Sequence, residues 1–185
     1  MRGRTLFWRR APWALTLILL GLPLLGAETL TEKKVKAAFL YNFAKFVQWP
    51  AGSLSSSRQP FVFCTLGATP LGGTLDEVLQ GKTIDDHPLL ARHLASLASV
   101  NGCQVLFVSA PKDGGAFTFP ANLRLPGLLT VTEAESKNQV CKNGAIITFV
   151  LESNRVRFVI DDKAAQKVGL VISSKLLSLA LPAGK

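Results

Sequence analysis

Short, almost continuous apolar runs recur along the chain, and they constrain the fold more than any other feature. Phe61 to Gly67 and Cys103 to Ser109 are rich in aromatic and β-branched residues, as buried strands of mostly parallel sheets are. Gly127 to Thr132 is a third such run. Gly144 to Leu151 and Val156 to Ile160 are separated by only a short polar segment, which predicts a hairpin. Because helical segments alternate with these runs, the sequence predicts one layered α/β domain: a mostly parallel central sheet, an antiparallel C-terminal hairpin and helices on the faces.

The first element of this domain is predicted to be an amphipathic helix. Thr31 is a suitable N-cap, and Glu32 falls in the first turn, where a negative charge suits the helix dipole. Apolar residues then recur at spacings of three and four until Trp49-Pro50, where proline disfavours helical angles in the preceding residue. The apolar side either packs on the sheet or offers an aromatic strip to a dimer or another partner. The candidate residues of such a surface are Phe39, Phe43, Phe46 and Trp49.

Prolines and capping residues place the other elements. These are a short helix that opens at Thr69-Pro70, a strand from Lys82 to Leu94 that is broken at His87-Pro88, and two closing helices, the first capped by Asp161 or Asp162 and the second after Ser173.

Residues 1–27 have the features of a cleaved secretory signal peptide. Four arginines precede an apolar run of about 13 residues, Trp13 to Leu25, and small residues follow. A spanning helix needs roughly 20 residues, so we expect cleavage and export of residues 28–185 to the periplasm. The leader holds four of the 21 basic residues and none of the 12 acidic ones, which leaves a net charge of +5. This modest charge does not indicate a nucleic-acid partner.

Three cysteines follow the leader. Cys64 and Cys103 lie in strand-like apolar runs, whereas Cys141 lies in the polar segment NQVCKNG. Disulfides persist in oxidising compartments, and adjacent strands can bring two sulfurs together when their Cβ atoms face each other. We therefore predict a Cys64–Cys103 disulfide, which leaves Cys141 either free or paired between chains.

Motifs for catalysis or cofactor binding are incomplete. Ser109-Ala-Pro-Lys112 matches the S-x-x-K pattern, but its proline suits a helix poorly and the companion motifs are absent. Gly81-Lys-Thr83 resembles the end of a phosphate loop, but Asp76 stands where the first glycine should be. Four residues are of types that can bind a metal, but no regular secondary structure fixes their spacing, so we interpret them as solvated loop residues: Asp85, Asp86, His87 and His93. We expect no catalytic residue, no metal and no cofactor.

An ordered set of segments resembles the YfiR-like family of bacterial periplasmic proteins. The set consists of VKAAFLYNFAKFVQWP, FVFCTLG, CQVLFVS, LLTVTE, NGAIITF, VRFVID, the AA-x3-GL piece at Ala164 to Leu170, and ISSKLLSLA at Ile172 to Ala180. Taken in this order along the chain, they make the resemblance extend over nearly all of residues 28–185.

The resemblance implies a regulatory protein rather than an enzyme. Its implied partner is the periplasmic part of an inner-membrane diguanylate cyclase, which it represses, so that release by a redox change or an outer-membrane lipoprotein raises cyclic-di-GMP and promotes biofilm formation. A homodimer is also implied. A second disulfide is implied near Cys141, but this chain has Thr148 one strand-length further on. The alternatives are a periplasmic ligand-binding module that serves a sensor kinase or transporter, with its ligand at the strand ends, and a hydrolase.

Overall fold

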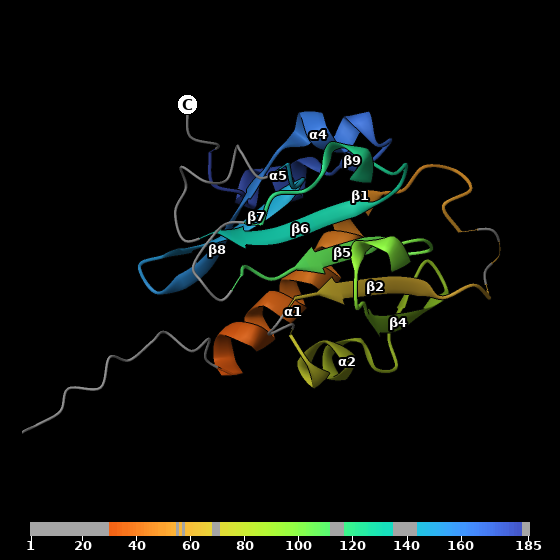
Figure 1. Ribbon diagram of the computed structural model, residues 1–185, viewed down its shortest axis with the longest axis horizontal. Coiled ribbons are helices and arrows are strands. Elements are labelled where there is room, and N and C mark those ends of the chain that lie inside the picture. The colour runs from red at the N-terminus through yellow and green to blue at the C-terminus, as the bar shows by residue number, and fades with distance from the viewer. Residues whose placement is uncertain are drawn as a thin grey trace, which may run out of the picture.

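A seven-stranded mixed sheet forms the centre of the protein (Figure 1). The structure is a computed structural model, and it describes residues 30–54, 56, 58–67, 71–111, 117–134 and 144–182. The strand order is β3-β4-β2-β5-β6-β7-β8. The strands are β2 (Phe61–Leu66), β3 (Thr83–Ile84), β4 (His87–His93), β5 (Val105–Val108), β6 (Leu129–Ala134), β7 (Ile147–Glu152) and β8 (Arg155–Ile160). The strands from β4 to β7 in this order pair in parallel, and β3–β4 and β7–β8 are antiparallel. The predicted fold class is confirmed.

Four helices accompany this sheet in the described part of the chain: α1 (Leu30–Phe46), α2 (Gly73–Leu79), α4 (Asp162–Lys167) and α5 (Ser174–Leu179). The cap of α4 is Asp161, whose carboxylate accepts from Ala164 N at 2.9 Å. Ser173 caps α5 in the same way through Leu176 N. Both caps follow the preference for Asp and Ser at this position. The predicted Thr31 cap is wrong, because α1 already includes Leu30.

The two faces of the sheet bury different side chains. Alternate residues point to opposite sides of a strand, so Phe61, Phe63, Phe107 and Phe149 share the face on which α1 and α2 pack, with Leu40 and Leu75 in the same core. We call this the helix face. Val62, Cys64, Leu106 and Val108 point to the other side, where they contact residues of the connecting segments such as Val100 and Leu123. We call this the loop face.

Short 3-10 helices and loops cover the loop face. They include η1 (Leu97–Ser99) and η2 (Ala121–Leu123). Threonines are buried among its strand residues, and Thr132 Oγ1 donates to Val108 O at 2.8 Å. The loop face is therefore more polar and has less aromatic surface to bury than the helix face.

Two tight hairpins flank the parallel strands. Asp85 and Asp86 connect β3 to β4, and Ser153 and Asn154 connect β7 to β8; all four residues have positive φ. Two successive positive φ angles are typical of type I′ turns, whose twist matches that of the strands. The hairpin near the C-terminus was predicted. The predicted break at His87-Pro88 is wrong, because both residues lie inside β4 and the chain turns at Asp85-Asp86.

A second, two-stranded sheet joins the end of α1 to the C-terminal region. It pairs β1 (Val47–Gln48) with β9 (Val171–Ile172) in antiparallel register. Neither short strand has a clear sequence pattern, and the sequence did not predict them.

Candidate functional site

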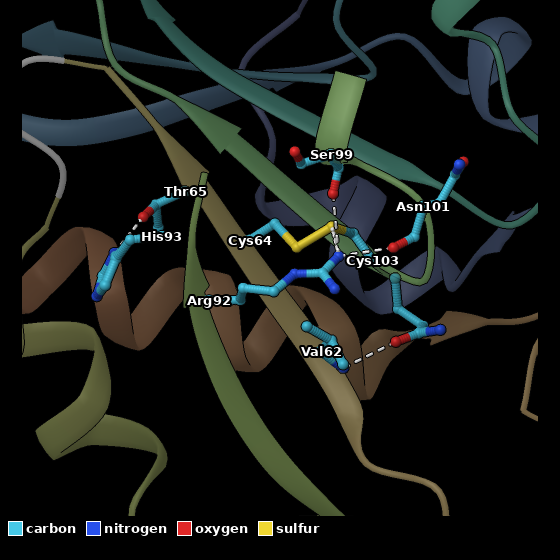
Figure 2. The surroundings of a disulfide bond; sticks show 9 residues. Val62, Cys64, Thr65, Arg92, His93, Ser99, Asn101 and Cys103 are labelled. Atoms are coloured by element: carbon cyan, nitrogen blue, oxygen red, sulfur yellow. Dashed lines mark hydrogen bonds between the residues drawn. A yellow bond between two sulfur atoms is a disulfide. The ribbon is translucent and has the colours of Figure 1, made fainter. Parts of the chain in front are cut away.

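A disulfide joins Cys64 to Cys103 on the loop face, as predicted (Figure 2). Cys64 lies in the middle of β2, and Cys103 comes just before β5 at the end of the segment that contains η1. Their Cα atoms are 5.8 Å apart, within the usual range for a disulfide. Both residues are buried. The bond therefore attaches a covering loop to the central strand.

Arg92 reinforces the same attachment. It stands beside Cys64 in the neighbouring strand β4, so their side chains share the loop face. In Figure 2 its guanidinium group reaches across the disulfide. Nη2 lies 2.7 Å from Asn101 O, 3.3 Å from Ser99 O and 3.0 Å from Cys103 Sγ. A cation thus satisfies carbonyl groups of the loop that the disulfide also holds.

The loop has a third point of attachment at Gln104. Its side-chain oxygen accepts from Val62 N at 2.8 Å, and its amide nitrogen donates to Ser53 O at 3.3 Å. Gln104 is buried, and a buried amide needs such partners. Segment 94–104, which we call the stapled loop, is therefore fixed covalently and by hydrogen bonds along its second half.

The aromatic residues of the predicted partner surface lie mostly inside the protein. Phe43 has no exposed surface, and its ring centroid lies 5.6 Å from that of Phe149 and 4.9 Å from that of Phe158. Phe39, Phe46 and Trp49 are partly buried against the same core. α1 therefore packs on the sheet through this side, and three of the four predicted surface residues, Phe39, Phe46 and Trp49, retain some exposed surface.

A charged cluster connects α1 to the carboxyl ends of the parallel strands. Lys36 is buried and binds Glu133, which lies near the end of β6, and Glu32 one turn earlier in α1. The other oxygen of Glu133 accepts from Ala110 N at 2.9 Å. This arrangement holds three elements together. Sequence reasoning missed it because Lys36 and Glu133 are 97 positions apart in the chain.

Thr65, His93 and Asp76 form a linear series that resembles a nucleophile, a base and an acid. Thr65 Oγ1 lies 2.6 Å from His93 Nδ1, and His93 Nε2 lies 3.4 Å from Asp76 Oδ2. Thr65 is only 1% exposed, whereas a nucleophile must touch its substrate. The geometry therefore supports a structural link between β2, β4 and α2, and does not support hydrolysis.

The remaining candidate residues are dispersed. His87 Nδ1 lies 2.8 Å from Gln59 O, far along β4 from His93. Within the described ranges no group of three metal-ligating side chains occurs. Cys141, Lys112 and the Thr69-Pro70 helix start lie outside the described residues. At the strand ends, Ser109 Oγ lies so close to Gly67 that a Cβ there would be 2.0 Å away. The flanking segments 68–70 and 112–116 are also outside, so a ligand site at the strand ends stays a prediction.

Comparison with protein families adds the decisive observation. The family model described as YfiR/HmsC-like matches residues 33–181, which include every helix and strand named above except the start of α1. The chain belongs to the YfiR/HmsC-like family. A comparison with curated proteins gives no match.

The matched range contains both cysteines of the disulfide and the whole seven-stranded sheet. The match begins within α1 and ends at Leu181, which forms an isolated bridge to Val159 of β8. None of the helices in the described part of the chain is long and apolar enough to cross a membrane. Residues 1–27, the predicted signal peptide, lie outside the described residues.

Proposed function

We propose that the protein is a periplasmic regulator that binds the periplasmic part of an inner-membrane diguanylate cyclase and represses it. Lower cyclic-di-GMP and reduced biofilm formation would follow. The observation that carries this proposal is the YfiR/HmsC-like match over residues 33–181. In this proposal residues 1–27 direct export and are removed, the protein acts as a homodimer, and an outer-membrane lipoprotein relieves the repression.

The Cys64–Cys103 bond supports the proposed location. Disulfides form and persist outside the cytoplasm, and this one joins two buried residues that are 39 positions apart. The domain has only one such bond among its described residues. A disulfide on the loop face is therefore consistent with a protein that folds in an oxidising compartment.

Repression requires a difference in affinity between two states of the cyclase. A bound protein shifts a conformational equilibrium only by as much as it prefers one state. A surface that is fixed before binding loses less entropy when it binds. The stapled loop and the parallel sheet supply such a pre-formed surface, which in this proposal binds the inactive cyclase more tightly than the active one.

The proposal is tested in cells that lack the gene. We expect deletion to raise intracellular cyclic-di-GMP and biofilm mass, and the full-length chain to restore both. A version without residues 1–27 is the matched control, because it has the same domain but is not exported, and it should not restore them. Affinity-tagged protein should also recover a membrane diguanylate cyclase from solubilised membranes.

Two results would contradict the proposal. One is an unchanged cyclic-di-GMP concentration after deletion together with recovery of no cyclase. The other is recovery of a sensor kinase or transporter in place of a cyclase, which would favour the ligand-binding alternative.

A further inference from the structure

In the part of the chain that the structure describes, one edge of the central sheet is open. Strand β4 pairs with β2 along Leu89 to His93, but its outer neighbour β3 is only two residues long and pairs with His87 and Pro88. Beyond that point, no strand in the described part of the chain pairs with the outer side of β4. Figure 1 shows β4 at the border of the sheet, next to α2. An open edge of this kind can accept another extended chain.

The register identifies the backbone groups that face outward. Leu94 N donates to Thr65 O at 2.8 Å, so Leu94 faces β2. The N–H and C=O groups of successive residues in a strand point to alternate sides. Those of Leu89, Ala91 and His93 therefore point away from the sheet, in line with His87, which pairs with Ile84 of β3. These groups would be the natural partners of an added strand.

A groove runs beside this edge. Its volume is about 390 Å³, and it lies between α2 and β4, with apolar residues in its floor and a pair of carboxylates on its α2 side. Leu90, which also borders the groove, is 48% exposed, and its pairing with Val62 places its side chain on the loop face of the edge. The side chains of a strand added beside β4 would cover this apolar surface. The complete lining is Asp76, Glu77, Leu79, Gln80, Leu89, Leu90 and Ala91.

The charges of the groove favour a particular occupant. Asp76 and Glu77 are both exposed on its rim, so a basic side chain on an incoming strand would meet two carboxylates. A second copy of this chain, added antiparallel along β4, would bring the same acidic rim toward its own image, which like-charge repulsion disfavours. A basic extended segment therefore fits better than a second copy.

The opposite edge of the sheet is protected. Leu181 N donates to Phe158 O at 2.8 Å, so the C-terminal segment covers part of β8. The exposed residues Arg155 and Arg157 place charge along the rest of it. Charged residues and covering segments are common ways to block edge pairing. At β4, neither protection covers Leu89 to Ala91 among the residues that the structure describes.

We propose that the open edge of β4 and its groove bind an extended, basic segment of the partner protein, which adds as a strand to the central sheet. Only the identity of that partner as the cyclase rests on the proposed function. Backbone hydrogen bonds to Leu89, Ala91 and His93 supply affinity, and the Asp76–Glu77 rim selects lysine or arginine.

The edge is tested by Ala91→Pro. The substitution removes an outward N–H and places a ring where the added strand would lie, while the bonds between β4 and β2 do not use that N–H. The binding probe is a labelled eight-residue peptide that alternates valine and lysine, and the control peptide alternates valine and glutamate. We expect the valine–lysine peptide to bind the native chain and to bind Ala91→Pro at least about tenfold more weakly. The glutamate peptide should not bind.

Two further variants keep the test decisive. Asp76→Lys with Glu77→Lys should weaken the lysine peptide by a similar factor and strengthen the glutamate peptide. If Ala91→Pro does not fold, Leu90→Lys, on an exposed side chain, should give the loss instead. Leu151→Lys, which changes an equally exposed residue of β7, is the matched control and should leave binding unchanged.

Recovery of the membrane cyclase separates the two proposals. Recovery by the native chain and not by Ala91→Pro supports both. Equal recovery and equal peptide binding by the two chains would overturn the edge proposal and leave the proposed function intact. Peptide binding that depends on Ala91 without any cyclase would support the edge and contradict the proposed function. A third result would also overturn the proposal: the native chain forms a dimer that Ala91→Pro dissociates, and it binds no peptide. The occupant of the edge would then be a second copy of this chain and not a basic segment of a partner.

Discussion

The two faces of the central sheet are held by different physical means. On the helix face, aromatic side chains of four elements meet, and Phe43 alone contacts three other phenylalanine rings. On the loop face, where threonines are buried among the strand residues, a disulfide and a guanidinium group hold short segments without long helices. Apolar area stabilises a helix that packs on a sheet. A covering loop has less area to bury, so it depends on specific links.

This difference predicts where a protein of this family tolerates change. Links can be removed one at a time, and each removal should loosen the stapled loop without disturbing α1. Removal of apolar volume from the helix face should instead lower the stability of the whole domain. The difference between the faces would be contradicted if loss of one link destabilised the whole domain, or if loss of apolar volume on the helix face loosened only one segment.

Phe43→Ala should have the largest effect. The side chain has no exposed surface and lies between α1 and the sheet, so the change leaves a cavity. Substitutions of this type cost about 3–5 kcal/mol of unfolding free energy. Denaturant unfolding followed by circular dichroism measures it. Leu179→Ala, at a residue that is 56% exposed, is the control and should stay within about 0.5 kcal/mol of the native chain. A similar small cost for Phe43→Ala would contradict the account of the helix face.

Cys64→Ala with Cys103→Ala should have the next largest effect. Loss of a disulfide typically lowers the unfolding free energy by about 2–4 kcal/mol, mainly because the unfolded chain becomes less restricted. We also expect amide hydrogen exchange to accelerate in residues 94–104, where the stapled loop loses its covalent link. The amides of α1 are the internal control and should change only as global stability changes. Reductant should lower the unfolding free energy of the native chain and leave that of this variant unchanged. Unaltered exchange in the loop would show that the disulfide does not hold it.

Local chemistry made much of this fold predictable. Asp161 and Ser173 occupy cap positions that depend only on the next few residues, so the two closing helices could be placed from the sequence. The apolar runs at β2, β5 and β6 are buried on both faces, and such strands leave a strong pattern. The disulfide followed from two cysteines in such runs.

Features that depend on tertiary contacts could not be predicted in the same way. Asp85 and Asp86 form the β3–β4 turn without the glycine that usually marks it, so the open edge of β4 was not expected. A charged residue in a strand usually indicates an exposed position, and nothing near Arg92 in the sequence shows that it reaches carbonyl groups seven and nine residues later. The aromatic strip was ambiguous for a similar reason, because periodicity shows which side of α1 is apolar but not what covers it.

Arg92→Met should have the smallest effect and gives the sharpest test of the loop face. Methionine keeps an unbranched apolar stem but cannot donate to Ser99 O or Asn101 O, and hydrogen bonds from charged groups contribute about 1.5–3 kcal/mol when they are buried. Arg92 is only partly buried, so we expect a loss of about 1–2 kcal/mol. Arg92→Lys is the control for charge alone, and it should not restore stability, because one ammonium group lacks the planar fork.

The same substitution in the Cys64→Ala, Cys103→Ala background decides whether the two links hold one unit. If the disulfide positions the stapled loop for Arg92, its removal allows the carbonyl groups to move away, and Arg92→Met should then cost less than half of what it costs in the native chain. Residues that share a structural element usually couple in this way. Denaturant unfolding of the four proteins gives the coupling free energy directly. Equal costs in both backgrounds would mean that Arg92 and the disulfide act independently, and the loop face would then be two separate attachments.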